Sequence, residues 1–178
     1  MLRMFAMCVM IVVSAASGFA AEVVSMKFCA TKDYDPAVMD CAAGKGLEGK
    51  SIRIDPSKIG SVQFLTAVKT PKDEAIYHVW ILGKSSAKVS VYDAATKTLR
   101  EADASDMTWL NERNIEGARV IVKMTASASD RFRLRSSKTL TPDMRGSWTV
   151  QVYEAAGTKA LGEMDFTVTP AATAEERP

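Results

Sequence analysis

A row of cationic side chains in the last third of the chain is the first feature that could bind a ligand. Arg131, Arg133 and Arg135 alternate with apolar residues, so in an extended strand all three project from one face, about 7 Å apart. One guanidinium group can donate two parallel hydrogen bonds to the oxygens of a carboxylate, phosphate or sulfate. A further cation, Lys138, follows in the same run. The pattern therefore indicates an anion-binding site. Alternating arginines are also typical of a solvated sheet face, and that alternative stays open.

His78 and Trp80 are the aromatic candidates for the same site. His78 is the only histidine of the sequence, and one residue separates it from Trp80. On one strand face the two rings could stack on a sugar, and the imidazole could act as a base. A lone histidine in an apolar strand is more often a hydrogen-bonded structural residue. A further tryptophan, Trp109, lies in a polar segment, and we expect it to be the tryptophan most accessible to a ligand.

The chain shows no recognisable catalytic or metal-binding constellation. Ser136 or Ser137 could pair with His78 as nucleophile and base, but no nucleophile-elbow sequence surrounds them and no orienting acid can be chosen. One histidine does not complete a zinc site, and neither a calcium loop nor a phosphate-binding glycine loop is present. The sequence therefore predicts a protein that is not an enzyme and has no cofactor or metal. A hydrolase is kept as a minor alternative.

Cys29 and Cys41 are expected to form a disulfide. The third cysteine of the sequence, Cys8, lies in the expected signal segment 1–20 and leaves with it. The remaining two cysteines of an exported chain pair most simply with each other, and closing a loop of about a dozen residues contributes about 3 kcal/mol. The alternative is a redox or metal-binding pair. The spacing is too long for a two-residue redox motif, and no histidine lies nearby to complete a zinc site.

Residues 1–20 have the pattern of a secretory signal peptide. Arg3 precedes an apolar stretch at 4–16, and Gly18-Phe19-Ala20 forms a small-x-small cleavage site before Ala21. The apolar stretch is too short for a stable membrane anchor. We therefore expect export to the periplasm or beyond, with a single domain at 21–169 and a disordered tail at 170–178.

Charge and hydropathy restrict the partners. Loss of Arg3 with the signal segment changes the formal net charge from +2 to +1, which gives no argument for binding nucleic acid. No later apolar run is long enough to span a bilayer, so no membrane insertion is expected after removal of the signal. The expected partners are an envelope glycan or a protein. The oligomeric state cannot be read from the sequence.

Alternation of apolar and polar residues recurs between turn-forming segments, which is typical of half-buried antiparallel strands. The expected strands cover 23–29, 51–54, 61–68, 75–82, 88–92, 119–125, 131–135, 146–153 and 164–168. The run at 75–82 is apolar on both faces, so we expect it to be central. Together these runs predict an all-β fold, an immunoglobulin-like antiparallel β-sandwich of about eight or nine strands.

The remaining segments connect these strands. We expect a helical turn at 37–43, a connector at 136–143, and at 94–117 either a short amphipathic helix or a loop with a strand fragment. The apolar residues of the last third are expected to share one face: Phe132, Leu134, Trp148, Val150, Val152, Met164, Phe166 and Val168.

Four short elements resemble a known family. They are Tyr77-His78-Val79-Trp80, Arg133-Leu134-Arg135-Ser136-Ser137-Lys138, Gly146-Ser147-Trp148-Thr149-Val150 and Phe166-Thr167-Val168. In this order they are similar to the bacterial domain of unknown function 2914, over roughly residues 24–168. The resemblance implies a small extracytoplasmic or membrane-attached β-rich domain with no established activity. The polar segment 94–117 does not align with the family pattern.

Two functions follow as hypotheses. The preferred one is a non-catalytic exported module that binds an anionic ligand, an envelope glycan or a partner protein. Its site would combine Arg131, Arg133, Arg135, Lys138, His78 and Trp80. The alternative is a structural or assembly subunit of an envelope complex, which makes its contacts through a sheet edge or through the 94–117 segment.

Overall fold

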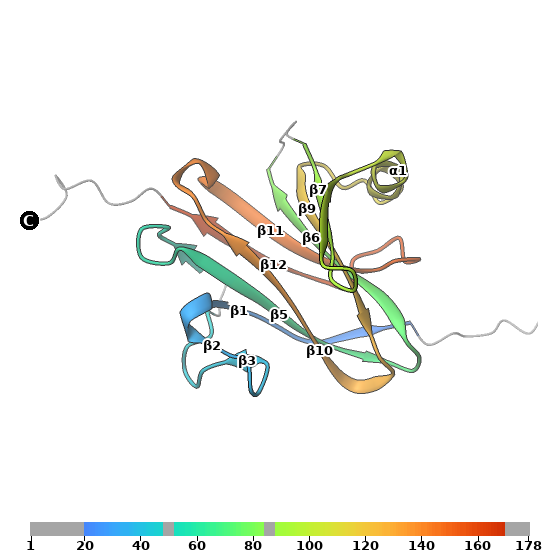
Figure 1. The fold of residues 1–178 in the computed structure, drawn as a ribbon, viewed down its shortest axis with the longest axis horizontal. Coiled ribbons are helices and arrows are strands. Elements are labelled where there is room, and N and C mark those ends of the chain that lie inside the picture. Colours follow the sequence, from blue (N-terminus) through green and yellow to red (C-terminus); the bar gives the residue numbers. More distant parts are fainter. Residues whose placement is uncertain (1–19, 48–51, 84–87, 170–178) are drawn as a thin grey trace, which may run out of the picture.

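The computed structural model describes residues 20–47, 52–83 and 88–169, and these form a β-sandwich with one helix on an outer face (Figure 1). The predicted all-β sandwich is therefore confirmed. The expected signal segment, apart from Ala20, and the expected tail lie outside the described residues.

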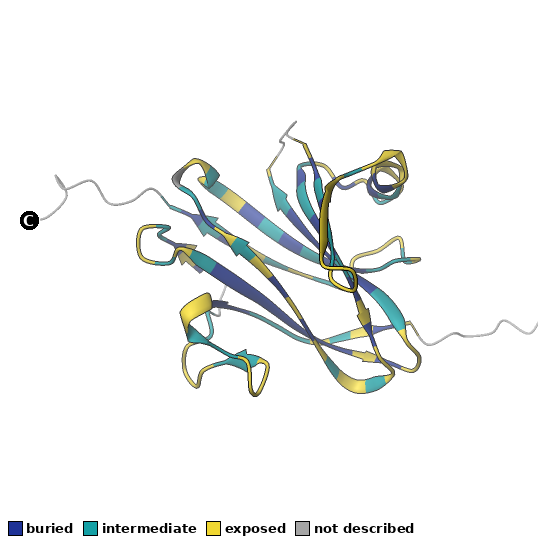
Figure 2. Ribbon diagram, in the orientation of Figure 1, coloured by how far each residue is buried: buried dark blue, intermediate teal, exposed yellow. Residues whose placement is uncertain are grey.

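The small sheet has three antiparallel strands in the order β1-β5-β10. Their bounds are Glu22–Ala30 for β1, Ser61–Thr70 for β5 and Ser129–Thr139 for β10. β5 is buried along almost its whole length, since both of its faces are covered (Figure 2). β10 forms one end of this sheet.

The large sheet has seven strands in the order β4-β12-β11-β6-β9-β7-β8. Their bounds are Ile52–Ile54 for β4, Gly162–Val168 for β12, Gly146–Glu154 for β11, Glu74–Leu82 for β6, Ala118–Ala126 for β9, Ser90–Asp93 for β7 and Thr98–Glu101 for β8. β6 lies in the middle, as its two apolar faces predict. The β12–β4 and β7–β9 pairs are parallel, so the sandwich is not purely antiparallel.

The main core lies between the two sheets and is rich in aromatic rings. Phe28 of β1 packs with ring centroids 4.9 Å from both Phe64 and Phe166, and Trp148 stacks on Phe166 at 5.9 Å. The apolar residues predicted from the last third all lie in or against this core. They do not share one face, however, because β10 belongs to the small sheet and β11 and β12 to the large one. They form two opposing faces.

A second, smaller core covers the other side of the large sheet. Here the helix α1 (Ala104–Glu112) places Leu110 against Val79 and Ile121 of the sheet. Figure 1 shows α1 beside β7 and β9 and away from β1 and β5. The segment 94–117 thus contains both a strand, β8, and a helix. No helix in the described part of the chain is long and apolar enough to cross a membrane.

Three local expectations were wrong. Residues 37–43 are not helical, because β2 (Tyr34–Asp35) and β3 (Asp40–Cys41) pair as a hairpin around a turn in which Met39 has φ of 50°. The connector expected at 136–143 begins at Leu140, since β10 stays paired with β5 up to Thr139. The described residues contain twelve strands, and the extra ones are too short to show alternation.

Two short 3-10 helices complete the described elements. The first, η1 (Thr31–Asp33), links β1 to the β2–β3 hairpin, and the second, η2 (Pro142–Met144), links β10 to β11. The carbonyl oxygen of Met144 accepts a hydrogen bond from Trp148 Nε1 at 2.9 Å, which fixes this connection against the large sheet.

Candidate functional site

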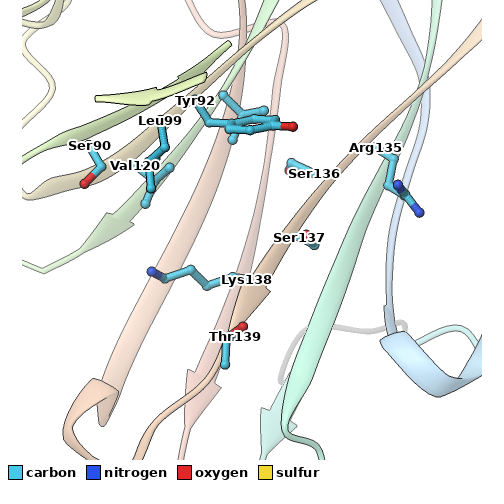
Figure 3. A pocket seen from close by; sticks show the side chains of 10 residues that line it. Ser90, Tyr92, Leu99, Val120, Arg135, Ser136, Ser137, Lys138 and Thr139 are labelled. Atoms are coloured by element: carbon cyan, nitrogen blue, oxygen red, sulfur yellow. The ribbon is translucent and has the colours of Figure 1, made fainter. Parts of the chain in front are cut away.

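A groove of about 390 Å³ opens beside the edge of β10 (Figure 3). It exists because the small sheet ends at β10, whereas the large sheet continues with β9, β7 and β8. The inner face of these strands forms the floor, which includes Tyr92, Leu99 and Val120, and β10 supplies a wall with Ser136 and Lys138.

Lys138 is the inward-facing cation of this groove, and Arg135 is the second basic residue among its lining. It faces inward on β10, like Leu134 and Ser136, and it is half-buried. Burial lowers the pKa of its ammonium group, the nearby charge of Arg119 lowers it further, and the carboxylate of Asp143 partly opposes both effects. In Figure 3 the side chain extends from β10 toward the floor strands. A bound anion would favour the charged form of this amine.

A buried chain of polar groups lies directly beneath the groove. His78 Nδ1 is 2.8 Å from Ser136 Oγ, and His78 Nε2 is 3.0 Å from Thr66 Oγ1. Trp80 Nε1 donates to the same Ser136 oxygen at 3.2 Å. His78 and Trp80 are completely buried, and burial lowers the pKa of the imidazole to about 3. His78 is therefore neutral at neutral pH, and the two residues reach the groove only through the Ser136 hydroxyl.

The arginine row lies on the opposite face of β10, on the outside of the small sheet. Arg133 donates to the Val38 carbonyl at 2.8 Å, and the Arg135 guanidinium lies 4.8 Å from the centre of the Tyr34 ring. Arg131 donates to Ser25 at 3.3 Å. The Arg133 and Arg135 contacts hold the β2–β3 hairpin against the outside of the small sheet, and the Arg131 contact reaches from β10 across β5 to β1. Together they explain why the outer face of β5 is also buried.

The structure thus divides the predicted site into three places. Arg131, Arg133 and Arg135 share one exposed face, as predicted. Lys138 points to the other side of the same strand, into the groove. His78 and Trp80 lie in the core below it, which favours the structural alternative considered for them.

A second charged cluster supports the floor of the groove and was not found from the sequence. The Asp106 side chain is almost completely buried and accepts hydrogen bonds from Arg100 at 2.5 Å and from Lys123 at 2.7 Å. Burial raises the pKa of this carboxyl, but the Arg100, Lys123 and Asp103 hydrogen bonds outweigh burial and hold the pKa far below its usual range. The cluster joins α1, β8 and β9. Its signal in the sequence is the capping box formed by Asp103 and Asp106.

Trp109 is the most exposed of the three tryptophans, as expected, but its contacts are mainly structural. Its Nε1 donates to the Ala155 carbonyl at 2.8 Å, and the Arg113 guanidinium lies 4.0 Å above its ring. Arg113 also donates to the carbonyl oxygens of Ala155 and Gly157. The pair fixes α1 to the loop between β11 and β12.

Cys29 and Cys41 lie next to each other as thiols joined by a hydrogen bond. Cys29 is fully buried, and burial together with the Cys41 contact raises the pKa of its thiol to about 12. This thiol is therefore a poor nucleophile in the reduced protein. The two thiols contact each other, and the disulfide itself stays a prediction.

Residues 107–168 match the family described as protein of unknown function (DUF2914). The predicted resemblance to DUF2914 is confirmed over this segment, which runs from α1 to the end of β12 and includes Lys138. The matched segment is shorter than the expected 24–168 and leaves Tyr77–Trp80 outside. It includes residues 107–117, which belong to the polar segment that was not expected to align with the family.

Beyond the DUF2914 segment, the comparisons give little. No curated protein matches the chain. One solved structure that resembles it is the Pseudomonas fluorescens alkylpurine DNA glycosylase AlkC bound to DNA containing an abasic site analog, with 9% sequence identity and a TM-score of 0.38. The similarity covers 84% of this chain and 30% of that protein. A likeness at this level carries no inference about function.

Proposed function

We propose that this protein is a non-catalytic binding module, exported to the periplasm or cell envelope, that holds an anionic ligand in the groove beside β10. The anionic groups would belong to a partner protein or an envelope glycan. The observation that carries the proposal is that the large sheet extends beyond the end of the small sheet, which leaves part of the inner face of β9, β7 and β8 uncovered next to Lys138.

The lining of the groove supports this proposal. Apolar side chains such as Tyr92 and Val120 can bury ligand surface, and the ten lining residues include two basic side chains and none that is acidic. Leu99 is 69% exposed on the floor, so a ligand that covered it would remove apolar surface from water. The groove volume lies within the range of ligand sites.

The proposal of export rests on the N-terminal sequence and is supported by the start of the domain. Ala21 is the first buried residue of the described chain, and its backbone N–H donates to the carboxylate of Glu154. The expected cleavage position before Ala21 therefore coincides with the edge of the packed region. A mature chain that began there would keep β1 and both cores.

The test is an affinity capture from an envelope extract of the host, with recovered proteins and glycans identified by mass spectrometry. Two groove variants, Lys138→Glu and Leu99→Glu, are compared with the wild-type chain. Lys58→Glu is the matched control, because Lys58 is exposed and does not line the groove. Melting temperatures establish that all variants fold. The proposal predicts a ligand that both groove variants lose and the control retains. Equal recovery by all four proteins would contradict it.

One observation favours the hydrolase alternative, namely the 2.8 Å contact between Ser136 Oγ and His78 Nδ1. A serine nucleophile requires a base whose other nitrogen is oriented, usually by a carboxylate. Here Thr66 contacts the other nitrogen, and Trp80 donates to the serine oxygen, which reduces its nucleophilicity. The arrangement therefore supports a structural network better than a catalytic one. Hydrolysis of an ester substrate that a folded His78→Ala variant no longer performs would reverse this conclusion.

A further inference from the structure

β10 has an edge that can accept another strand. It is the end strand of the small sheet and pairs with β5 along residues 129–139. In the described part of the chain no strand pairs with its other edge. Edge strands present backbone N–H and C=O groups to an incoming extended chain, and this is a recurrent way in which proteins bind peptides.

A strand added at this edge would extend the small sheet over the groove floor. Neighbouring strands lie about 4.8 Å apart, and the large sheet continues on that side with β7 and β8 below. A guest strand would therefore cover Tyr92, Leu99 and Val120 on the groove floor. Alternate side chains of the guest would point down to this floor, and the others would point to the outside of the small sheet.

The side chains of β10 indicate the chemistry of such a guest. Its outward residues would lie beside the exposed arginine row, at Arg133 and Arg135, and opposite charges on neighbouring strands attract. Its inward residues would meet an apolar floor with Lys138 as the cation. A second copy of this chain, paired through the same edge, would place arginines beside arginines, which is unfavourable.

We propose that the groove, in the binding function proposed above, receives an extended segment of a partner protein that pairs with the free edge of β10. The segment alternates acidic with apolar residues. Its acidic side chains lie beside Arg133 and Arg135, and its apolar side chains pack on Tyr92, Leu99 and Val120. The arginine row on the outer face of β10 and the groove beside its edge, which Arg135 also lines, then serve one ligand.

The first experiment measures binding of two labelled ten-residue peptides to the full chain by fluorescence anisotropy. One peptide alternates glutamate with valine, and in the other lysine replaces glutamate. The glutamate peptide is expected to bind about tenfold more tightly than the lysine peptide. The double variant Arg133→Glu/Arg135→Glu should reverse this preference, and Lys58→Glu should leave it unchanged. If the double variant does not fold, Arg133→Gln/Arg135→Gln should remove the preference. A preference unaffected by either double variant would overturn the proposal.

The second experiment tests the backbone pairing directly. Successive residues of a strand direct their N–H groups to opposite edges, so N-methylation of every second residue blocks one edge only. One of the two alternately methylated glutamate peptides should lose binding by about tenfold or more, and the other should retain it. The sensitive set also reports the direction of the guest strand.

The outcomes separate this inference from the proposed function. If both methylated peptides bind equally well and the Leu99→Glu variant still loses binding, the groove holds a ligand that is not an added strand, and only the inference fails. If neither Leu99→Glu nor Lys138→Glu weakens binding of the glutamate peptide, and neither lowers recovery of a ligand from the envelope extract, the inference and the proposed function fail together. A dimer seen by analytical ultracentrifugation that the glutamate peptide fails to dissociate would show that a second copy occupies the edge, and it would overturn the inference.

Discussion

The single histidine gives this protein a stability that depends on pH in a calculable way. His78 is fully buried, its pKa is lowered by burial to about 3, and in the unfolded chain an imidazole has a pKa of about 6.5. As the pH falls below 6.5, the unfolded chain takes up a proton that the folded chain does not accept until about pH 3. His78 therefore destabilises the folded protein progressively as the pH falls from about 6.5 toward 3, and it has no such effect above this range.

The size of the effect follows from the difference between the two pKa values. At pH 5 the imidazole of the unfolded chain is protonated, because this pH is about 1.5 units below its pKa. The imidazole of the folded chain is still neutral at this pH. Each pH unit corresponds to about 1.4 kcal/mol, so His78 lowers the free energy of unfolding by about 2 kcal/mol between pH 8 and pH 5.

Urea denaturation followed by tryptophan fluorescence at pH 8 and pH 5 measures this change. Because His78 is the only histidine, a His78→Gln variant removes its contribution and leaves the other titrating groups in place. Between pH 8 and pH 5, the free energy of unfolding should fall by about 2 kcal/mol less in the variant than in the wild type. An NMR titration of the wild-type imidazole should show no protonation between pH 8 and pH 5. Protonation with a midpoint near pH 6.5 would refute the reasoning, as would an equal loss of stability in the variant.

Three further predictions follow. Asp106→Asn should lower the free energy of unfolding, measured by urea denaturation at pH 7, by about 2 kcal/mol. The difference between variant and wild type should shrink below about pH 4, where the carboxyl of the unfolded chain protonates. A difference that does not depend on pH would contradict the assigned contacts. If Cys29 and Cys41 form the predicted disulfide, both residues should resist alkylation when the exported protein is unfolded without reductant. The double serine variant should then be less stable by about 3 kcal/mol. Complete alkylation would exclude the disulfide. Intact-mass analysis of the exported protein should place its N-terminus at Ala21, and retention of the first 20 residues would contradict the signal peptide.

The strands were largely predictable because alternation is a local property. β11 and β12, for example, alternate apolar and polar or charged residues, and both appear close to the expected bounds. The central place of β6 was also predictable, since a strand with two apolar faces must be covered on both sides. The β2–β3 hairpin was missed because each of its strands has only two residues, too few to show a period.

The groove could not be predicted, because it depends on the order of strands in the two sheets. Tyr92, Leu99 and Val120 come from three different strands, and nothing in their local sequence shows that the small sheet ends beside them. The arginine row was recognised because its alternation is local. Its separation from Lys138 also follows from alternation, but only if β10 continues to Thr139, and the serines at 136 and 137 suggested that it ends earlier.

Hydrogen–deuterium exchange on the full chain, with and without the captured ligand, tests most directly whether the groove is the binding site. The account predicts that the ligand slows amide exchange in β10 and in the floor strands β7 and β9, and that exchange in the β2–β3 hairpin is unchanged. Slower exchange confined to the hairpin, or to α1 and the β11–β12 loop, would place the ligand elsewhere and contradict the proposed function.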